Sequence, residues 1–136
     1  DELESIYMIE LAELYLVLDN EEKCLYYYQK AYEIDPATTE IVLDYAQAMH
    51  HFDATEPAVA MLENHSKVFD IDHRILYRIC SYKFCLGHFE EGYTLLHEAL
   101  DLNASDYFLL YEYSPFVENI ENVTNIIDLY TQDSND

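Results

Sequence analysis

Apolar residues recur along the chain at intervals of three and four, the spacing that places side chains on one face of an α-helix. The first such stripe covers residues 4–18, and a second follows over residues 21–34. Asp19 and Asn20 separate the two stripes and can cap the second helix. Asp35-Pro36 ends it, because proline disfavours helical conformation in the residue before it. The pattern therefore predicts a pair of helices joined by a short turn.

The same plan recurs twice further along the chain. In the second pair, Thr55 can cap the following helix, and Pro57 is tolerated in its first turn. In the third pair, Gly87 stands where a left-handed residue commonly ends a helix, and a helix over residues 90–102 follows. Each of these helices again carries an apolar stripe, so three helix pairs are predicted.

The fourth segment departs from this plan at Ser114-Pro115, because a helix interior cannot easily hold proline. We expect a short helix near residues 106–113. A second helix should begin after Ser114 or near Asn122. The tail, residues 132–136, is polar and is expected to fray.

These segments share a period of 34 residues, with repeats beginning at Ser5, Thr39, His73 and Tyr107. The eighth place of every repeat holds a small residue: Ala12, Ala46, Cys80 and Ser114. The twentieth place is small in all but the last: Cys24, Ala58, Gly92 and Ile126. A fixed period in this range is typical of stacked-repeat architectures, which supply surfaces more often than catalytic pockets.

The residues at these places resemble the tetratricopeptide repeat. The resemblance is carried by Leu14-Tyr15, Ala31 and Ile34-Asp35-Pro36, and by the run 86–92 (LGHFEEG) with Leu96, Ala99 and Leu100. It implies an all-α fold, a right-handed superhelical stack of antiparallel helix pairs. A single domain over residues 1–136 would hold full repeats near 5–38, 39–72 and 73–106, with a degenerate one at 107–131. Lys83 and His65 depart from the family pattern, and His65 is expected at a locally loosened helix contact.

The resemblance also implies a concave groove lined by the first helix of each pair, where a peptide or a helix of another protein binds. Mapped onto this sequence, the groove-facing places predict a lining of Glu13, Leu16, Val17, Leu43, Gln47, His50, Arg74, Tyr77, Phe84 and Tyr111. For the first repeat an alternative stays open. Its residues Ile6, Ile9, Leu16 and Val17 could instead contact an upstream repeat of a longer chain.

One subclass of the family clamps a C-terminal carboxylate with basic and amide side chains. Arg74 and Arg78 match one part of that clamp, but Ile9, Glu13 and Asp44 occupy its other places. Two acids at these positions would repel a carboxylate, which excludes the clamp. Arg74 and Arg78 could pair with neighbouring acids such as Asp70, Asp72 or Glu40, or hold an acidic group of a ligand.

The charge of the chain narrows the choice of partners. Six Lys and Arg face 28 Asp and Glu, giving a formal net charge of −22. Such a surface maintains solubility and could also attract basic partners. Nucleic acid is disfavoured as a partner, because no basic stripe is present to neutralise phosphates.

Targeting signals are not recognisable in the sequence. No stretch has the length and apolarity of a membrane span. The three cysteines form no CxxC pair, and two of them occupy small core places, which favours reduced thiols and a cytoplasmic location. The chain begins with Asp rather than Met, so we expect a fragment of a longer protein that could have lost its targeting information.

Catalytic and metal-binding motifs are not recognisable either. With two glycines, phosphate-cradling loops are nearly excluded, and no HExxH or GxSxG occurs. His50-His51 is the most metal-like feature, but adjacent helical residues point about 100° apart and do not readily share one ion. We therefore expect no enzyme activity, no cofactor and no metal.

The sequence predicts a protein-interaction module that binds a peptide or protein segment of basic and apolar character, without nucleic acid or membrane partners. The alternative is a structural end-cap of a longer array, or a homo-oligomer formed through the first helix, with no ligand of its own.

Overall fold

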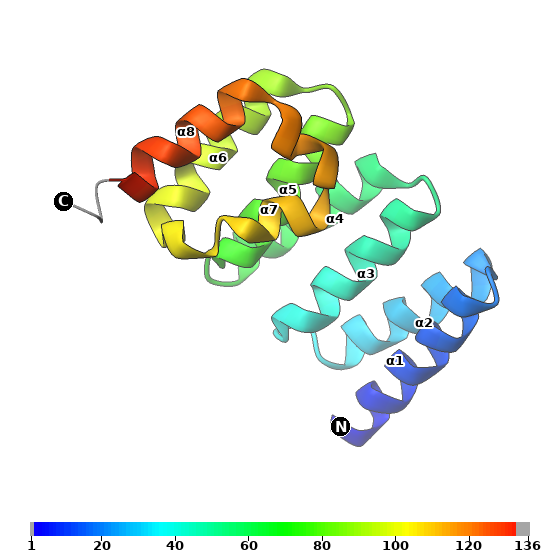
Figure 1. The fold of residues 1–136 in the computed structure, drawn as a ribbon. Coiled ribbons are helices and arrows are strands. Elements are labelled where there is room, and N and C mark those ends of the chain that lie inside the picture. The colour runs from blue at the N-terminus through cyan, green and yellow to red at the C-terminus, as the bar shows by residue number, and fades with distance from the viewer. Residues whose placement is uncertain (1, 133–136) are drawn as a thin grey trace. The chain divides into compact units, whose positions relative to one another are not determined.

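The computed structural model describes residues 2–132, and all regular elements in that range are helical (Figure 1). The chain divides into two compact units, Asp1–Phe69 and Asp70–Asp136. The N-terminal unit contains α1 (Glu2–Val17), α2 (Glu21–Ile34), α3 (Thr39–His51) and α4 (Thr55–Val68). The C-terminal unit contains α5 (His73–Cys85), α6 (Phe89–Asn103), η1 (Ala104–Asp106), α7 (Phe108–Tyr113), η2 (Pro115–Asn119) and α8 (Glu121–Thr131). The all-α prediction is confirmed for this range.

The helix boundaries follow the 34-residue period. The second helices of the first three pairs begin at Glu21, Thr55 and Phe89, each 34 residues after the one before. The first helices of the second and third pairs begin at Thr39 and His73, the predicted starts of these repeats.

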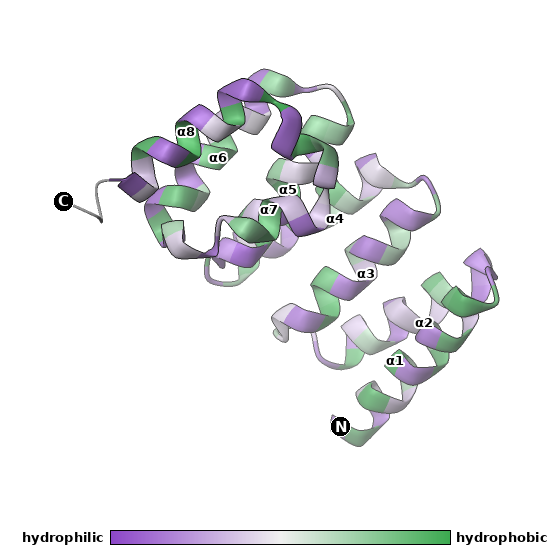
Figure 2. Cartoon of the chain, in the orientation of Figure 1, coloured by the Kyte–Doolittle hydropathy of each residue, from purple (hydrophilic) through white to green (hydrophobic). Residues whose placement is uncertain are grey.

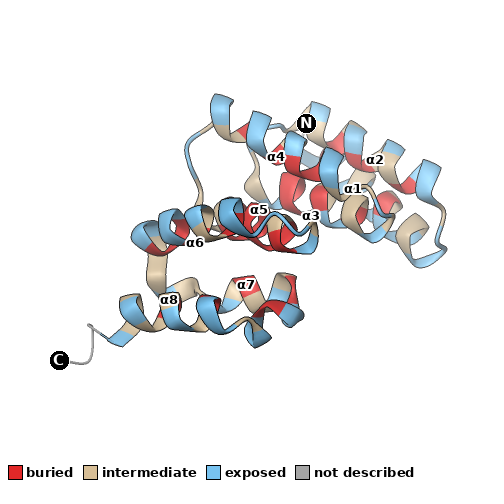
Figure 3. Cartoon of the chain, turned by 90° about the horizontal axis from the view of Figure 1, so that it is seen from above, coloured by how far each residue is buried: buried red, intermediate tan, exposed pale blue. Residues whose placement is uncertain are grey.

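The small residues of the repeat are buried between helices. Ala12, Ala46 and Cys80 at the eighth place have no exposed surface, and Ser114 is buried as well. Cys24, Ala58 and Gly92 at the twentieth place are also buried. Small side chains let two helix backbones approach closely. Buried positions, red in Figure 3, recur on the helices of both units.

The turn inside each of the first three pairs has the same backbone conformation. Asp19, Asp53 and Gly87 occupy the fifteenth place of their repeats and have φ of 56°, 65° and 79°. The next residue donates its N–H to a carbonyl five residues earlier: Asn20 to Tyr15 at 2.9 Å, Ala54 to Met49 at 2.8 Å and His88 to Lys83 at 2.8 Å. This is the Schellman arrangement, which satisfies carbonyls at a helix C-terminus. The left-handed conformation predicted at Gly87 is confirmed, and two aspartates share it.

Helix capping agrees with the sequence in one place and differs in another. Asn20 caps α2, since its side chain accepts the N–H of Lys23 at 3.1 Å. Thr55 does not cap α4 as predicted, because it is already the first helical residue and Ala54 precedes it at the cap position. Its hydroxyl instead hydrogen-bonds to Nδ1 of His50 at 2.7 Å.

A His–Tyr hydrogen bond links the second helices of successive pairs in each unit. In the N-terminal unit, Tyr32 on α2 and His65 on α4 meet at 2.8 Å, hydroxyl oxygen to Nδ1. In the C-terminal unit, His97 on α6 and Tyr130 on α8 meet at 2.9 Å through the same atoms. His65 is buried and its ring lies 4.6 Å from that of Phe69, centroid to centroid. His65 therefore lies at a packed helix contact, and the loosened contact predicted there from the sequence is wrong.

The fourth pair is interrupted where the sequence predicted. α7 ends at Tyr113, one residue before buried Ser114, and Pro115 begins the short helix η2. α8 follows from Glu121 and buries Val123 and Ile127 against the core of the C-terminal unit. The predicted fraying of residues 132–136 falls almost entirely outside the described residues.

Candidate functional site

The predicted groove residues of the N-terminal unit differ in their accessibility. Glu13, Val17 and Gln47 are exposed, and Leu16 is half-buried. Leu43 is buried on α3 and does not offer its side chain to a ligand. The sixth residue of this set, His50, is half-buried and holds the hydroxyl of Thr55.

In the C-terminal unit, the structure places Tyr77 and Phe84 in the core, which contradicts their predicted place on an accessible groove. Their exposed fractions are 0% and 2%. The Tyr77 hydroxyl donates to the backbone carbonyl of Asn103 at 2.7 Å, so the ring spans from α5 to the end of α6. Of the predicted lining here, Arg74 and Tyr111 remain, and both are half-buried.

Phe84 is buried because Gly92 makes room for it. A Cβ atom added to Gly92 would lie 2.8 Å from the Phe84 ring, so the ring occupies the space that a side chain would need. The rings of Phe89 and Tyr93 lie 5.9 and 5.4 Å from that of Phe84, centroid to centroid. The missing side chain at the twentieth place thus turns a predicted groove residue into a core residue.

Arg74 pairs with a neighbouring acid, which is one of the two alternatives that the sequence left open. Its side chain donates to Asp72 through Nε at 3.1 Å and Nη2 at 2.8 Å, and its backbone N–H donates to the same carboxylate at 2.8 Å. Burial opposes ionisation of Asp72, but the hydrogen bonds from Arg74 outweigh it and lower the pKa of that carboxyl. Arg74 is therefore engaged in holding the start of α5.

Arg78 is buried among aromatic rings. Its guanidinium carbon lies 3.6 Å from the centroid of the Tyr113 ring, and Nη1 donates to the Tyr82 hydroxyl at 3.4 Å. Its Nε has no hydrogen-bond partner among the described residues. A cation stacked on an aromatic face is stabilised by the ring quadrupole, so Arg78 contributes to the core rather than to a ligand surface.

An exposed apolar face runs along α1, and the sequence mapping identified only Ile6 and Val17 of it. It comprises five residues on one side of the helix and one just after its end: Leu3, Ile6, Tyr7, Leu14, Val17 and Leu18. Val17 and Leu3 are 83% and 79% exposed, whereas Ser5 and Ala12 on another side of the helix are buried. We refer to these six residues as the α1 face; apolar segments along α1 are visible in Figure 2. A helix that is apolar on more than one side indicates a further contact surface, and this signal was present in the sequence.

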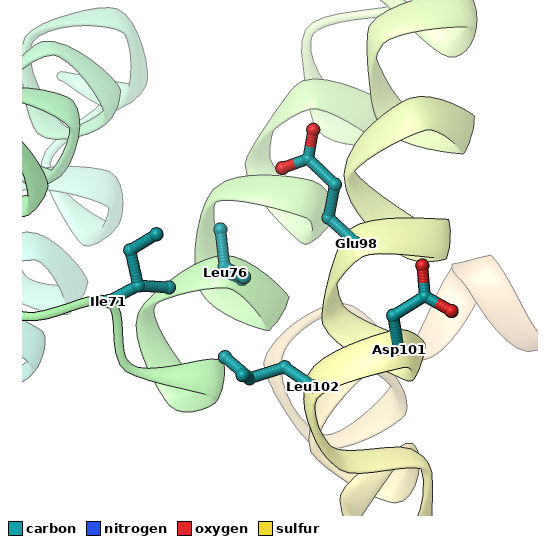
Figure 4. A pocket seen from close by; sticks show the side chains of 5 residues that line it. All are labelled: Ile71, Leu76, Glu98, Asp101 and Leu102. Atoms are coloured by element: carbon teal, nitrogen blue, oxygen red, sulfur yellow. The ribbon is translucent and has the colours of Figure 1, made fainter.

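A pocket of about 510 Å³ lies in the C-terminal unit, between the start of α5 and the second half of α6. Figure 4 shows Leu76 on α5, Leu102 on α6 and Ile71 in the preceding segment around it. The carboxylate of Glu98 leans toward α5, whereas that of Asp101 is directed away from Leu76. We call it the α5–α6 pocket. The repeat mapping did not find it, because most of its lining belongs to the second helix of the pair.

Nucleophiles and metal ligands are not gathered into a site in the part of the chain that the structure describes. Burial raises the pKa of the Cys24 thiol to about 11 and raises that of Cys80 as well, so neither forms a thiolate readily. Cys85 is exposed, and its sulfur lies 3.3 Å from the Ser114 hydroxyl oxygen. No group of three His, Cys, Asp or Glu side chains in residues 2–132 could hold a metal ion.

The geometry defines an all-α protein built from helix pairs with a 34-residue period, with an apolar face on α1 and an acid-rimmed pocket on α5 and α6. No protein-family model matches the chain, and a search of curated proteins finds none that is significantly similar. None of the helices described is both long enough and apolar enough to cross a membrane.

Proposed function

We propose that this chain is a non-catalytic, tetratricopeptide-like interaction module that binds a protein segment carrying basic and apolar side chains. The α1 face is the observation that carries the proposal. Leu3, Tyr7 and Leu14 follow one another at helical spacing and are exposed, so a partner helix could lay its own apolar side chains along them.

The charge of α1 favours a basic partner over a second copy of this chain. The helix contains Glu2, Glu4, Glu10 and Glu13 and no Lys, Arg or His. A basic segment would meet opposite charges there, which speeds encounter and disfavours acidic competitors. Two copies would instead bring like charges together, on chains that each carry a net charge of −22.

Fluorescence anisotropy with two labelled peptides tests this function. The first is an amphipathic helical peptide with leucines at positions i, i+3, i+4 and i+7 and lysines on its flanks; the second has the same composition in scrambled order. We expect the first to bind more tightly, and its affinity to fall as salt is raised. Equal binding of both peptides, or no binding of either, would refute the proposal.

Substitutions on the α1 face locate the binding surface. Leu14→Ser with Val17→Ser removes exposed apolar area and should weaken the peptide about tenfold or more, because each side chain contributes roughly 1 kcal/mol or more when buried. The matched control is Val68→Ser with Leu129→Ser, since these are the same two residue types, also exposed, but on α4 and α8. An equal loss in the control would mean that the α1 face is not the surface used.

The second candidate function is self-association through the α1 face, which the same six exposed side chains would also support. Sedimentation velocity at several concentrations separates the two. We expect a monomer at moderate salt, and a dimer abolished by Leu14→Ser with Val17→Ser would favour self-association.

A further inference from the structure

The exposed residues of α1 follow the spacing of a coiled-coil seam. Successive intervals of four, three, four and three residues join Leu3, Tyr7, Glu10, Leu14 and Val17. This alternation averages 3.5 residues, the period at which one helix packs lengthwise against another. Four of the five side chains are apolar, and their exposed fractions run from 51% for Leu14 to 83% for Val17. We call these five residues the α1 seam; its middle place holds the one charged residue.

Glu10 lies on the solvent side of α1, among these apolar side chains. It follows Tyr7 by three residues and precedes Leu14 by four, the spacings that make helical side chains neighbours. Ala12, which has no exposed surface, is two residues further on and therefore about 200° around the helix. The Glu10 side chain itself is exposed. Any helix that covers Tyr7 and Leu14 together must therefore cover Glu10 as well.

Glu10 has no counter-ion of its own within residues 2–132, where it makes neither an ion pair nor a hydrogen bond through its side chain. The lysines of α2 are engaged elsewhere. Lys30 pairs with Glu33 at 3.6 Å, Nζ to carboxylate oxygen. The Nζ atom of Lys23 lies 5.2 Å from the centroid of the Tyr15 ring. Water hydrates the Glu10 carboxylate in the free chain, and covering it without a partner would be strongly unfavourable, because an isolated charge loses its hydration on burial.

Resting on the proposed function, we propose that Glu10 selects the partner: the helix that binds the α1 face carries one lysine or arginine at the middle of an otherwise apolar seam. The cationic group of that residue pairs with the Glu10 carboxylate. Its methylene stem lies on Tyr7 and Leu14, in the way that long basic side chains cover apolar surface. A single polar residue at a seam position fixes the register of two helices, so Glu10 also determines which partner residues meet Leu3 and Val17.

A second copy of this chain fits the α1 seam poorly. Glu10 is the third of five seam places, so two α1 helices paired in register, parallel or antiparallel, bring Glu10 against Glu10. A shift by one heptad sets it against Leu3 or Val17 and leaves the carboxylate unpaired. A wholly apolar partner helix would desolvate the carboxylate in the same way.

Two matched peptides test the assignment by fluorescence anisotropy with the intact chain. Each is an amphipathic helical peptide with five seam places at intervals of four and three, leucine at the outer four and lysines on its flanks. The middle place holds lysine in one peptide and norleucine, the same straight chain without the ammonium, in the other. We expect the lysine peptide to bind about tenfold more tightly. Equal affinities, or tighter binding of the norleucine peptide, would overturn the proposal.

A substitution of Glu10 shows whether this residue makes the choice. Glu10→Leu removes the charge at an exposed position and should reverse the preference, so that the norleucine peptide binds more tightly. Glu63→Leu is the matched control, since Glu63 is also exposed but lies on α4. The control should keep the preference for lysine. The same change of preference in both variants would refute a role specific to Glu10.

Sedimentation velocity gives a second readout that needs no peptide. Because Glu10 opposes pairing of two α1 helices, Glu10→Leu should form dimers at concentrations where the wild-type chain and Glu63→Leu remain monomeric. A Glu10→Leu variant that dimerises no more than Glu63→Leu would contradict the exclusion of a second copy.

Failure of this inference and failure of the proposed function give different results. If both peptides bind equally and Leu14→Ser with Val17→Ser weakens both, the role of Glu10 is wrong and the proposed function stands. If neither peptide binds, the proposed function fails and the role of Glu10 fails with it.

Discussion

Gly92→Ala should destabilise the protein, although alanine is the better helix former. An added Cβ would lie 2.8, 2.9 and 3.1 Å from three carbons of the Phe84 ring, closer than ordinary van der Waals contact. The ring is 2% exposed and is flanked by the rings of Phe89 and Tyr93, so it cannot swing into solvent. The clash therefore has to be relieved by moving α5 and α6 apart.

The magnitude follows from two opposed terms. Overpacking of a well-filled core costs about 1–3 kcal/mol. Replacing glycine by alanine in a helix gains at most about 1 kcal/mol, and less in a first turn such as this one. We expect a net loss of about 1–2 kcal/mol in the free energy of unfolding.

Urea unfolding followed by circular dichroism measures this loss, and a double-mutant cycle assigns its cause. In a Phe84→Leu background the ring atoms that clash are absent, so Gly92→Ala should be neutral or stabilising there. The coupling energy between the two positions should be about 1–3 kcal/mol. Stabilisation by Gly92→Ala in the wild-type background, or a coupling below about 0.5 kcal/mol, would refute this account of the Phe84–Gly92 contact.

Three further predictions concern the turns, the His–Tyr pairs and the start of α5. Gly87→Ala should cost about 1 kcal/mol by urea unfolding, since no atom lies within 4 Å of the added Cβ and only the left-handed backbone is strained; no loss would contradict the turn assignment. Tyr32→Phe should cost about 1 kcal/mol or more, because it removes the hydroxyl that hydrogen-bonds to buried His65; unchanged stability would contradict that bond. Asp72→Asn should reduce stability at pH 7. Because Arg74 lowers the folded-state pKa of Asp72, this carboxylate stabilises the fold above its unfolded pKa of about 3.9, and the contribution is lost as pH falls through the lowered value. Urea unfolding from pH 7 to pH 3 should show the gap between wild type and variant closing; a gap that widens would contradict this sign.

The helix pairs could be predicted from sequence because their signals are local and repeated. The small residues at Ala12, Ala46 and Cys80, and the break at Pro115, each act through their own backbone or their nearest helix. Asp19 and Asp53 were harder to foresee in the left-handed conformation, since only Gly87 carries the residue type that favours it. The shared place in the repeat was the signal that could have identified them.

The candidate site was predicted less well because it depends on what each helix meets in space. Assigning Tyr77 and Phe84 to a groove assumed that every repeat buries the same places, but Gly92 draws the Phe84 ring inward. Leu18 is the last residue of the first predicted apolar stripe, residues 4–18, and is 62% exposed. Whether such a residue is buried or exposed depends on the side chains next to it in space. The period of the sequence does not identify those neighbours.

The repeated Schellman turns have a consequence for how the chain folds. Each turn joins two helices that are adjacent in sequence, so a helix pair can form with little loop-closure entropy and early in folding. The fourth pair has no such turn, and its helices α7 and α8 are joined through Pro115 and η2. We expect these two helices to form last, on the surface that α5 and α6 have already built.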